Sequence, residues 1–267
     1  MKKNLIIGGF SGYEYPQVQR WVESVCAVAD SNTDKVMAIG KTSQETQDKL
    51  ISMGFILIDM PIADNIPVHV LRFICIYEFL KTRYTNYKYV VTTDVRDVIF
   101  QRNPFEWIVN YMDPRKSLIA ASESMKYKDE PWGNQNLMET YGPYIYENFK
   151  FNEIYNVGVL AGESEYIKDL VFNIFVNGVN RPIPIVDQAV YNVMIQTQPF
   201  KDAIDFVSHD SGWACQLGTT GDPRKIDYFR ENLLGPEPVY KDGAVYTSSG
   251  EKYYIVHQYD RVPDWKL

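Results

Sequence analysis

The chain has 267 residues, of which 45% are hydrophobic and 23% are charged, and its formal net charge at pH 7 is −7. These values are typical of a globular protein with one large α/β domain or two small domains. The sequence has no long basic tract, which argues against a nucleic-acid partner. It also has no run approaching the roughly 20 apolar residues that a transmembrane helix needs.

The three cysteines, Cys26, Cys75 and Cys215, are odd in number and far apart in the sequence. They form neither a CxxC metal pattern nor a disulfide framework. The early apolar stretch NLIIGGF, residues 4–10, is too short for the core of a signal peptide. Together these features indicate a reducing compartment, and we expect a cytoplasmic protein.

The first hundred residues alternate between strand and helix patterns. Short apolar runs predict buried strands, and longer runs with apolar residues at helical spacing predict helices. The expected strands are residues 5–9, 35–40, 55–61 and 87–100, and the expected helices are residues 15–29, 43–53 and 67–83. This alternation predicts a mostly parallel sheet, in which ligands bind beyond the carboxyl ends of the strands.

The pattern is looser after about residue 125. Residues 126–149 are rich in aromatic and turn residues, and so many rings predict a packed surface segment rather than a solvated linker. Beyond it we expect a strand at 156–162, a helix at 164–178, a helix that begins near 186–188 and a strand-like segment up to His257. No linker divides the chain, so we predict one domain of residues 1–267.

Residues 87–107, YKYVVTTDVRDVIFQRNPFEW, place two carboxylates and an arginine at the end of an apolar strand. Two ionised carboxylates about 4 Å apart repel by roughly 4 kcal/mol at an effective dielectric constant of 20. The repulsion between Asp94 and Asp97 can be relieved by a raised pKa of one carboxylate, by pairing with a cationic side chain or by binding a metal. Arg96 could neutralise them in a structural ion-pair cluster. A hard ion such as Mg²⁺ or Mn²⁺ could also bind them, because both side chains offer oxygen and no cysteine is near.

The order of motifs along nearly the whole chain resembles that of the nucleotide-sugar-dependent glycosyltransferases of the GT-A fold. This family carries an Asp-x-Asp-type motif at the end of its fourth strand, where it holds a divalent cation and the donor diphosphate. TTDVRDVIFQRNPF, residues 92–105, is similar, with the wider spacing Asp-x-x-Asp. The resemblance implies a Rossmann-like α/β fold whose mostly parallel central sheet is flanked by helices. It also implies a nucleotide-sugar-binding half, residues 1–125, and an acceptor-binding half, residues 126–267.

Other segments resemble ligand-binding segments of the family in the same order. VLRFICIYEF, residues 70–79, places Arg72 like the donor-contacting basic residue, and YYIVHQYDR, residues 253–261, places His257 like the late metal-binding histidine. YNVGVLAG (155–162) and VDQAVYN (186–192) resemble the acceptor-side strand and helix start of retaining members. IIGGFSGYE, residues 6–14, resembles the nucleotide-contacting loop, which implies a base and ribose pocket lined by Gly8, Gly9, Phe10, Ser11 and Tyr13.

The resemblance also implies roles at the reaction centre. Asp94, Asp97 and His257 would hold Mn²⁺ or Mg²⁺, and the second ring nitrogen of His257 would need an acceptor such as a backbone carbonyl. Asp187 would be the carboxylate near the anomeric carbon, with Asp94 as a second catalytic residue. The donor, a UDP- or GDP-sugar, would also contact Arg72, Arg96 and Asn156. An aromatic segment around Trp132 and Tyr144 would face the acceptor sugar.

Each of these residues also has a simpler interpretation. Arg72 could form a buried ion pair with Glu78 or with a distant carboxylate, and Asp187 could be the N-cap of a helix. Asn156-Val157-Gly158 could be a bulged strand, and His257 a hydrogen-bonded structural histidine. We expect His69 and His209 to be structural.

The expected function is metal-dependent transfer of a hexose or similar sugar from a nucleotide-diphosphate sugar to a glycan or another hydroxyl acceptor. A non-catalytic nucleotide-sugar-binding protein on the same fold is an alternative. A sugar nucleotidyltransferase is another, although it would normally carry a basic glycine-rich loop after the first strand, and GGFSGYE has no lysine or arginine. The sequence leaves open whether Asp187 acts as a base or stabilises an oxocarbenium ion.

Overall fold

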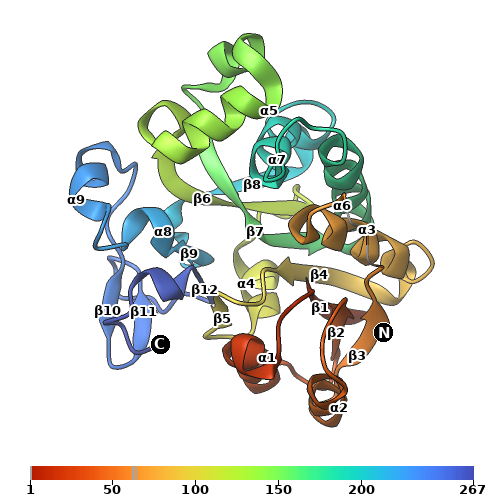
Figure 1. Ribbon diagram of the computed structural model, residues 1–267. Coiled ribbons are helices and arrows are strands. Elements are labelled where there is room, and N and C mark those ends of the chain that lie inside the picture. Colours follow the sequence, from red (N-terminus) through yellow and green to blue (C-terminus); the bar gives the residue numbers. More distant parts are fainter. Residues whose placement is uncertain (1, 62, 64) are drawn as a thin grey trace.

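A seven-stranded sheet runs through the computed structural model, which describes residues 2–61, 63 and 65–267. Its strand order is β3-β2-β1-β4-β7-β6-β8. Neighbouring strands are parallel except at β7, which runs antiparallel to both β4 and β6. Helices cover both faces (Figure 1). The expected mostly parallel sheet flanked by helices is confirmed.

The elements have the following bounds. The large sheet consists of β1 (Lys3–Phe10), β2 (Thr33–Ile39), β3 (Ile56–Asp59), β4 (Tyr87–Thr93), β6 (Leu118–Lys126), β7 (Glu153–Glu163) and β8 (Ile204–Val207). The helices of eight residues or more are α1 (Tyr15–Val28), α2 (Gln44–Ser52), α3 (Val68–Leu80), α4 (Pro104–Tyr111), α5 (Pro131–Phe149), α6 (Ser164–Gly178) and α7 (Asp187–Ile195).

A smaller sheet of three strands stands beside the large one, in the order β5-β12-β9. It joins a segment from the middle of the chain to two from its end, and this pairing shapes the site described below. Its strands are β5 (Val98–Phe100), β9 (Ala214–Gln216) and β12 (Ile255–His257). The remaining elements are a hairpin, β10 (Val239–Lys241) and β11 (Ala244–Tyr246), and two short helices, α8 (Leu217–Thr220) and α9 (Ile226–Phe229).

The large sheet is buried on both faces. Successive side chains of a strand point to opposite faces, so Leu5 and Ile7 of β1 pack into the cluster that includes α3 and α6, while Ile6 packs into the one that includes Trp21 of α1. A strand buried on both sides is continuously apolar, which explains the run LII in β1.

The segment expected as one strand over residues 87–100 is divided in two. β4 ends at Thr93, residues 94–97 form a bend, and β5 then joins the smaller sheet. The bend lets the carboxylates of Asp94 and Asp97 leave the apolar interior, where ionised groups would be costly. The backbone N–H of Asp94 donates to the carbonyl of Gly158 on β7, 2.9 Å away, as the chain leaves the sheet.

Residues 126–149, expected as a packed surface segment rather than a linker, are mostly helical. Pro131 opens α5, and the carboxylate of Glu130 caps the helix by accepting from the N–H of Gly133. Gly142, with φ of +77°, kinks the helix in the middle. Two of the turn residues in this segment, Pro131 and Gly142, are therefore the helix start and its kink.

None of the helices in the described part of the chain has the length and apolar character that a membrane span needs. Cys26, Cys75 and Cys215 are free thiols.

Candidate active site

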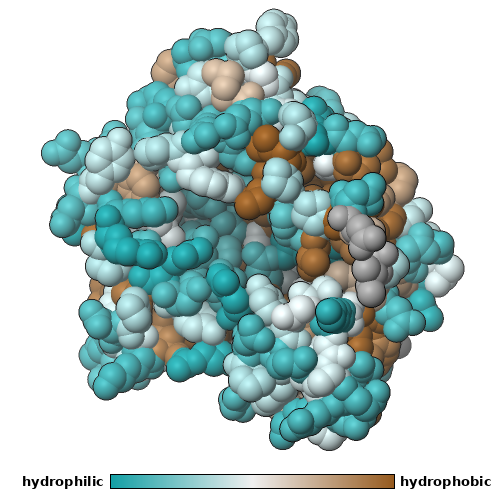
Figure 2. Space-filling model, in the orientation of Figure 1, coloured by the Kyte–Doolittle hydropathy of each residue, from teal (hydrophilic) through white to brown (hydrophobic). Residues whose placement is uncertain are grey.

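A cavity of about 1150 Å³ opens beyond the ends of β1 and β4, where the sequence places the ligand site. Figure 2 shows the surface hollowed there, with hydrophilic residues in its depth and a hydrophobic rim on one side. Residues from both halves of the chain line this cavity, from Gly9 near the first strand end to His257 and Arg261 near the last.

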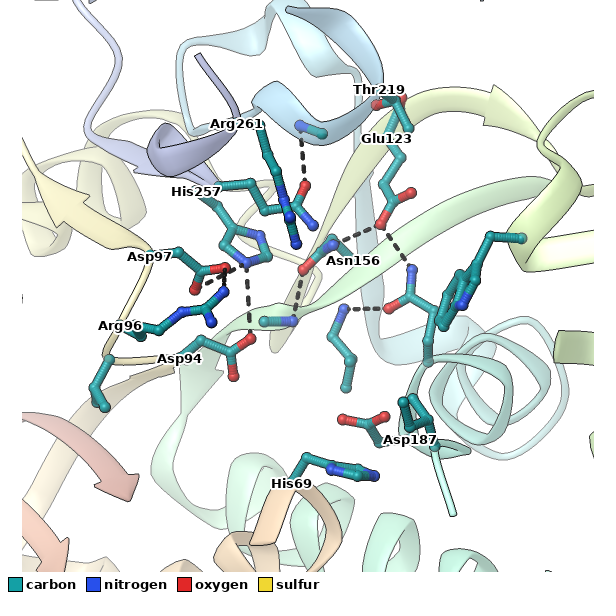
Figure 3. Close-up of a pocket in the computed structure, with 18 of the residues that line it drawn as sticks. His69, Asp94, Arg96, Asp97, Glu123, Asn156, Asp187, Thr219, His257 and Arg261 are labelled. Carbon is teal, nitrogen blue, oxygen red and sulfur yellow. Dashed lines mark hydrogen bonds and ion pairs between the residues drawn. The ribbon is translucent and has the colours of Figure 1, made fainter. Parts of the chain in front are cut away.

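Asp94, Asp97 and His257 meet in the wall of the cavity (Figure 3). β5 pairs antiparallel with β12, with Val98 opposite His257, and this register brings the histidine beside the bend that follows β4. The N–H of Gln258 also donates to the carbonyl of Asp97 at 2.6 Å. Nε2 of His257 lies 3.7 Å from a carboxylate oxygen of each aspartate. One candidate ligand atom from each residue lies within 4.8 Å of the others.

The three side chains fit a divalent cation. Nδ1 of His257 lies 2.8 Å from the side-chain oxygen Oε1 of Gln216, so the ring donates from Nδ1 and turns the lone pair of Nε2 toward the carboxylates. Burial lowers the pKa of His257 from its ordinary value, which favours the neutral form of the ring that can bind a metal. The acceptor for Nδ1 is thus a side-chain amide and not the backbone carbonyl we expected. Two carboxylates and one neutral imidazole suit Mn²⁺, or Mg²⁺.

Gly158 makes this close arrangement possible. A Cβ on Gly158 would lie 2.6 Å from Cε1 of His257 and 2.9 Å from Oδ2 of Asp94, closer than real carbon contacts allow. The floor of the site is therefore bare backbone of β7, which explains the glycine in YNVGVLAG.

Arg72 links the triad to Asp187. It lies in the apolar helix α3, is 6% exposed and forms an ion pair with Oδ1 of Asp94. Its guanidinium is also 3.6 Å from Oδ2 of Asp187. Burial lowers the pKa of Arg72, and Asp187 and Asp97 oppose that shift. The simpler interpretations of Arg72 were an ion pair with Glu78 or with a distant carboxylate, and the structure supports the distant carboxylate.

Asp187 is not an N-cap. Val186 takes that position, and Asp187 is the first residue of α7, with its buried side chain directed to the cavity. Near the rim, Arg96 reaches Asp97 at 3.7 Å and Asp260 at 3.2 Å. The arginine expected to neutralise both aspartates thus pairs with Asp97, while Asp94 pairs with Arg72.

The predicted nucleotide loop is divided by the structure. Gly8 is not among the described residues that line the cavity, and a Cβ at this position would collide with the side chain of Val95 and approach Trp21. The other predicted loop residues do line the cavity: Gly9, Phe10, Ser11 and Tyr13.

The two aromatic residues expected to face the acceptor sugar differ in position. Trp132, at the start of α5, lines the cavity mouth, whereas Tyr144 is 79% exposed on the second half of that helix, away from the cavity.

The two histidines expected to be structural differ in position. Nε2 of His69 lies 2.7 Å from the carbonyl oxygen of Pro184 at the edge of the cavity. His209 is buried away from the cavity against the ring of Tyr253.

Several polar residues of the cavity were not predicted from the sequence, among them Glu123 on β6 and Gln188 on α7. Oε1 of Glu123 accepts hydrogen bonds from the side-chain amides of Asn156, at 2.5 Å, and Gln188, at 2.8 Å. The sequence signal for Glu123 was a carboxylate within the mostly apolar run LIAASESM, and for Gln188 an amide directly after Asp187.

No family model and no curated protein matches this chain. Solved structures do. Mouse xyloside xylosyltransferase 1, in its apo form, has a TM-score of 0.58 at 13% identity, over 96% of this chain and 97% of that one. The bifunctional glycosyltransferase WbbM has a TM-score of 0.56 at 11% identity, over 96% of this chain but only 45% of WbbM. The galactosyltransferase LgtC, solved with donor and acceptor sugar analogues, has a TM-score of 0.54 at 13% identity, over 95% of this chain and 86% of LgtC. The chain therefore has the GT-A fold of glycosyltransferases, as its sequence predicts.

Proposed function

We propose that the protein is a metal-dependent glycosyltransferase. It transfers a hexose or similar sugar from a UDP- or GDP-sugar to a hydroxyl group of a glycan or similar acceptor. The observation that carries the proposal is the meeting of Asp94, Asp97 and His257 in the wall of a large cavity at the strand ends. The likeness to structures of a xylosyltransferase and a galactosyltransferase supports it.

Asp94, Asp97 and His257 are the residues that would hold Mn²⁺ or Mg²⁺. The bound ion would stabilise the negative charge of the departing diphosphate. The charges of the site favour such an ion, because negative charge is in excess. The carboxylates of Asp94, Asp97 and Asp187 are only partly neutralised by Arg72 and Arg96. Arg96 is shared because it also pairs with Asp260.

Arg72 contributes a fixed positive charge. The ion pair with Asp94 and the proximity of Asp187 hold its guanidinium in place before a ligand arrives, so no reorganisation is needed as charge develops on the diphosphate. Arg96 offers a second, more exposed cation on the other side of the triad. We assign both arginines to the donor diphosphate.

The rest of the cavity is divided between donor and acceptor. We assign Gly9, Phe10, Ser11 and Tyr13 to the nucleoside, with Gly8 behind them, and Asn156 to the donor sugar. Asp187 is our candidate for the carboxylate near the anomeric carbon, with Asp94 beside it, and Trp132 for a ring that stacks on the acceptor sugar. Residues 1–125 would then carry most of the donor site and residues 126–267 the acceptor site, with His257 of the second half completing the metal site.

A binding screen and one substitution test this function. UDP-, GDP- and dTDP-sugars are screened by thermal shift with and without Mn²⁺. Saturation at a hundredfold excess over Kd raises the free energy of unfolding by about 2.7 kcal/mol. We expect one donor class to bind in a manner that EDTA reverses. Asp97→Asn keeps the shape of the side chain but removes the charge, and should abolish Mn²⁺-dependent binding and turnover in a folded protein.

Asp169→Asn is the matched control, because Asp169 lies on the surface of α6 beside Lys168. Turnover that survives EDTA or Asp97→Asn would contradict the metal-dependent function. Donor binding with no turnover at all would instead identify a nucleotide-sugar-binding protein.

A further inference from the structure

Glu123 is a cavity carboxylate that the metal and donor sites proposed above leave unused. Its Oε1 accepts from two side-chain amides, those of Asn156 and Gln188. Oε2 has no hydrogen-bond partner among the described residues, and Glu123 lines the cavity. Figure 3 shows Asn156 between Glu123 and His257, so Glu123 lies on the side of the cavity away from the metal ligands.

Two side-chain amides that are themselves bound to the backbone of β7 fix the orientation of the Glu123 carboxylate. The amide oxygen of Asn156 accepts from the N–H of Gly158 at 2.6 Å, and that of Gln188 accepts from the N–H of Val157 at 2.9 Å. Each amide therefore uses its oxygen on the backbone of β7 and must turn its NH₂ group toward Glu123. Thr219 holds the main chain, because its hydroxyl donates to the Glu123 carbonyl at 2.6 Å.

We propose that Glu123 binds the acceptor, with Oε2 accepting the hydrogen bond of an acceptor hydroxyl group. This proposal rests on the function proposed above and adds the chemistry of acceptor recognition. An ionised carboxylate oxygen can only accept, so the partner must carry a donor, as a sugar hydroxyl does. The carboxylate of Glu130 and the cations of Arg224 and Lys225 also line this cavity, so the proposal concerns a hydroxyl group of the acceptor and not its net charge.

The charge state of Glu123 makes the proposal testable by pH. Burial raises the pKa of Glu123 to about 7, and Glu130 adds to the rise, while the hydrogen bonds from Asn156 and Gln188 and the ammonium of Lys225 oppose it. The remaining titratable neighbour, Tyr127, is neutral at this pH because burial raises its pKa well above 10. Above pH 7 the ionised Oε2 only accepts hydrogen bonds. Below pH 7 the proton is carried by Oε2, because Oε1 already accepts from both amides, and Oε2 becomes a donor and a weaker acceptor for a hydroxyl group.

The experiment uses water as the probe acceptor. Water can donate a hydrogen bond to Oε2 as an acceptor hydroxyl does, and hydrolysis of the bound donor can be measured without knowing the natural acceptor. Donor hydrolysis with Mn²⁺ is measured across pH 5.5–8.5 (about one and a half units on either side of the pKa) for the wild type and for Glu123→Gln. The glutamine keeps an oxygen for both amides but replaces Oε2 by NH₂. We expect unchanged donor affinity and a loss of hydrolysis of roughly tenfold to a hundredfold, the value of a hydrogen bond to a charged group. The fall in rate toward acid near pH 7 should also be absent.

Glu153→Gln is the matched control, since Glu153 starts the neighbouring strand β7 and contacts Ser122 and Tyr155 outside the cavity. Wild-type hydrolysis in Glu123→Gln would overturn the proposal, and so would equal losses of donor affinity and hydrolysis. A wild type that binds no donor, or that binds donor but never turns it over, would instead overturn the proposed function itself. If Glu123→Gln does not fold, Glu123→Asp, which withdraws the carboxylate by one methylene, must show the same loss.

Discussion

Arg72 and Asp94 form an ion pair on the cavity wall that divides the two oxygens of the aspartate between two partners. Oδ1 pairs with the guanidinium of Arg72, and Oδ2 lies 3.7 Å from Nε2 of His257. The arginine thus sets which oxygen of Asp94 is turned toward the metal position. The proposed donor and metal sites are coupled through this one side chain.

Arg72→Lys should weaken donor binding by about tenfold or more, because charge-assisted hydrogen bonds are worth roughly 1.5 to 3 kcal/mol each. Lysine retains the positive charge beside Asp187 and Asp94, but lacks the planar fork that can contact a diphosphate as well. Binding of the nucleoside and of the nucleoside diphosphate, measured by calorimetry with Mn²⁺, should differ, with the loss confined to the diphosphate. Arg115→Lys, at a side chain 85% exposed, is the control. Equal losses for both ligands would assign Arg72 a structural role.

His257→Ala should lower the affinity for Mn²⁺ while the protein stays folded. The wild type adds a pH test. Only the neutral ring can bind a metal, so affinity should fall as pH drops through the pKa of His257, which burial places below 6.5. Mn²⁺ affinity is measured by electron paramagnetic resonance between pH 5 and 7.5 (a window of about one unit or more around 6.5). His69→Ala, at the cavity edge and bonded to the Pro184 carbonyl, should retain wild-type affinity. Preserved affinity in His257→Ala would exclude the ring from the metal site.

The elements of the first half were predictable because their local signals agree with their environment. β1, β2 and α1 lie within two residues of their predicted bounds, since a strand buried on both faces is continuously apolar and a helix on one face is amphipathic. The division of 87–100 was not predictable, because it depends on β5 pairing with β12 from the end of the chain. Local patterns carry no information about such a distant partner.

The candidate site was likewise predictable only where a local sequence signal marked a residue. The carboxylates of Asp94 and Asp97 stood out because charge interrupts an apolar strand, and Arg72 because charge interrupts an apolar helix. Glu123 gave the same kind of signal, but between two serines, which weakened the contrast. The role of Gln216 depends on β9 lying parallel to β12, with Gln216 opposite His257, which no short motif encodes.

Gly158→Ala should disrupt the metal position without unfolding the protein. The new methyl group would lie 2.6 Å from Cε1 of His257 and 2.9 Å from Oδ2 of Asp94, so both side chains would have to move. We expect Mn²⁺ affinity to fall by about tenfold or more, since a misplacement near 1 Å in a preorganised site is costly. Gly235→Ala, where the added methyl group meets only Oγ of Ser124 at 3.6 Å, is the control. Unchanged affinity in Gly158→Ala would contradict the geometry of the triad.

His209 should make the protein less stable in mild acid. Its side chain is 2% exposed, and neither ring nitrogen has a hydrogen-bond partner among the described residues. Burial lowers the pKa of His209 to about 4, and Asp210 only partly opposes this. In the unfolded chain the pKa of this histidine is about 6.5, so at mildly acidic pH the unfolded chain binds a proton at His209 and the folded chain does not. The contribution of neutral His209 to the free energy of unfolding is therefore fully present above a pH of about 6.5. It is lost as pH falls toward about 4, by up to roughly 3 kcal/mol.

The contribution of His209 is isolated by His209→Phe, which keeps a ring against Tyr253 but removes the titratable group. Urea unfolding is followed at several pH values from about 7.5 to about 4.5, a range that crosses the unfolded-state pKa near 6.5 and approaches the folded-state value. The variant should lose less stability on acidification than the wild type. His257 shifts in the same direction, so all measurements are made without metal, where its contribution is common to both proteins. Equal losses in wild type and variant would mean that His209 is protonated in the folded chain, against the expectation from its burial and its unpaired ring nitrogens.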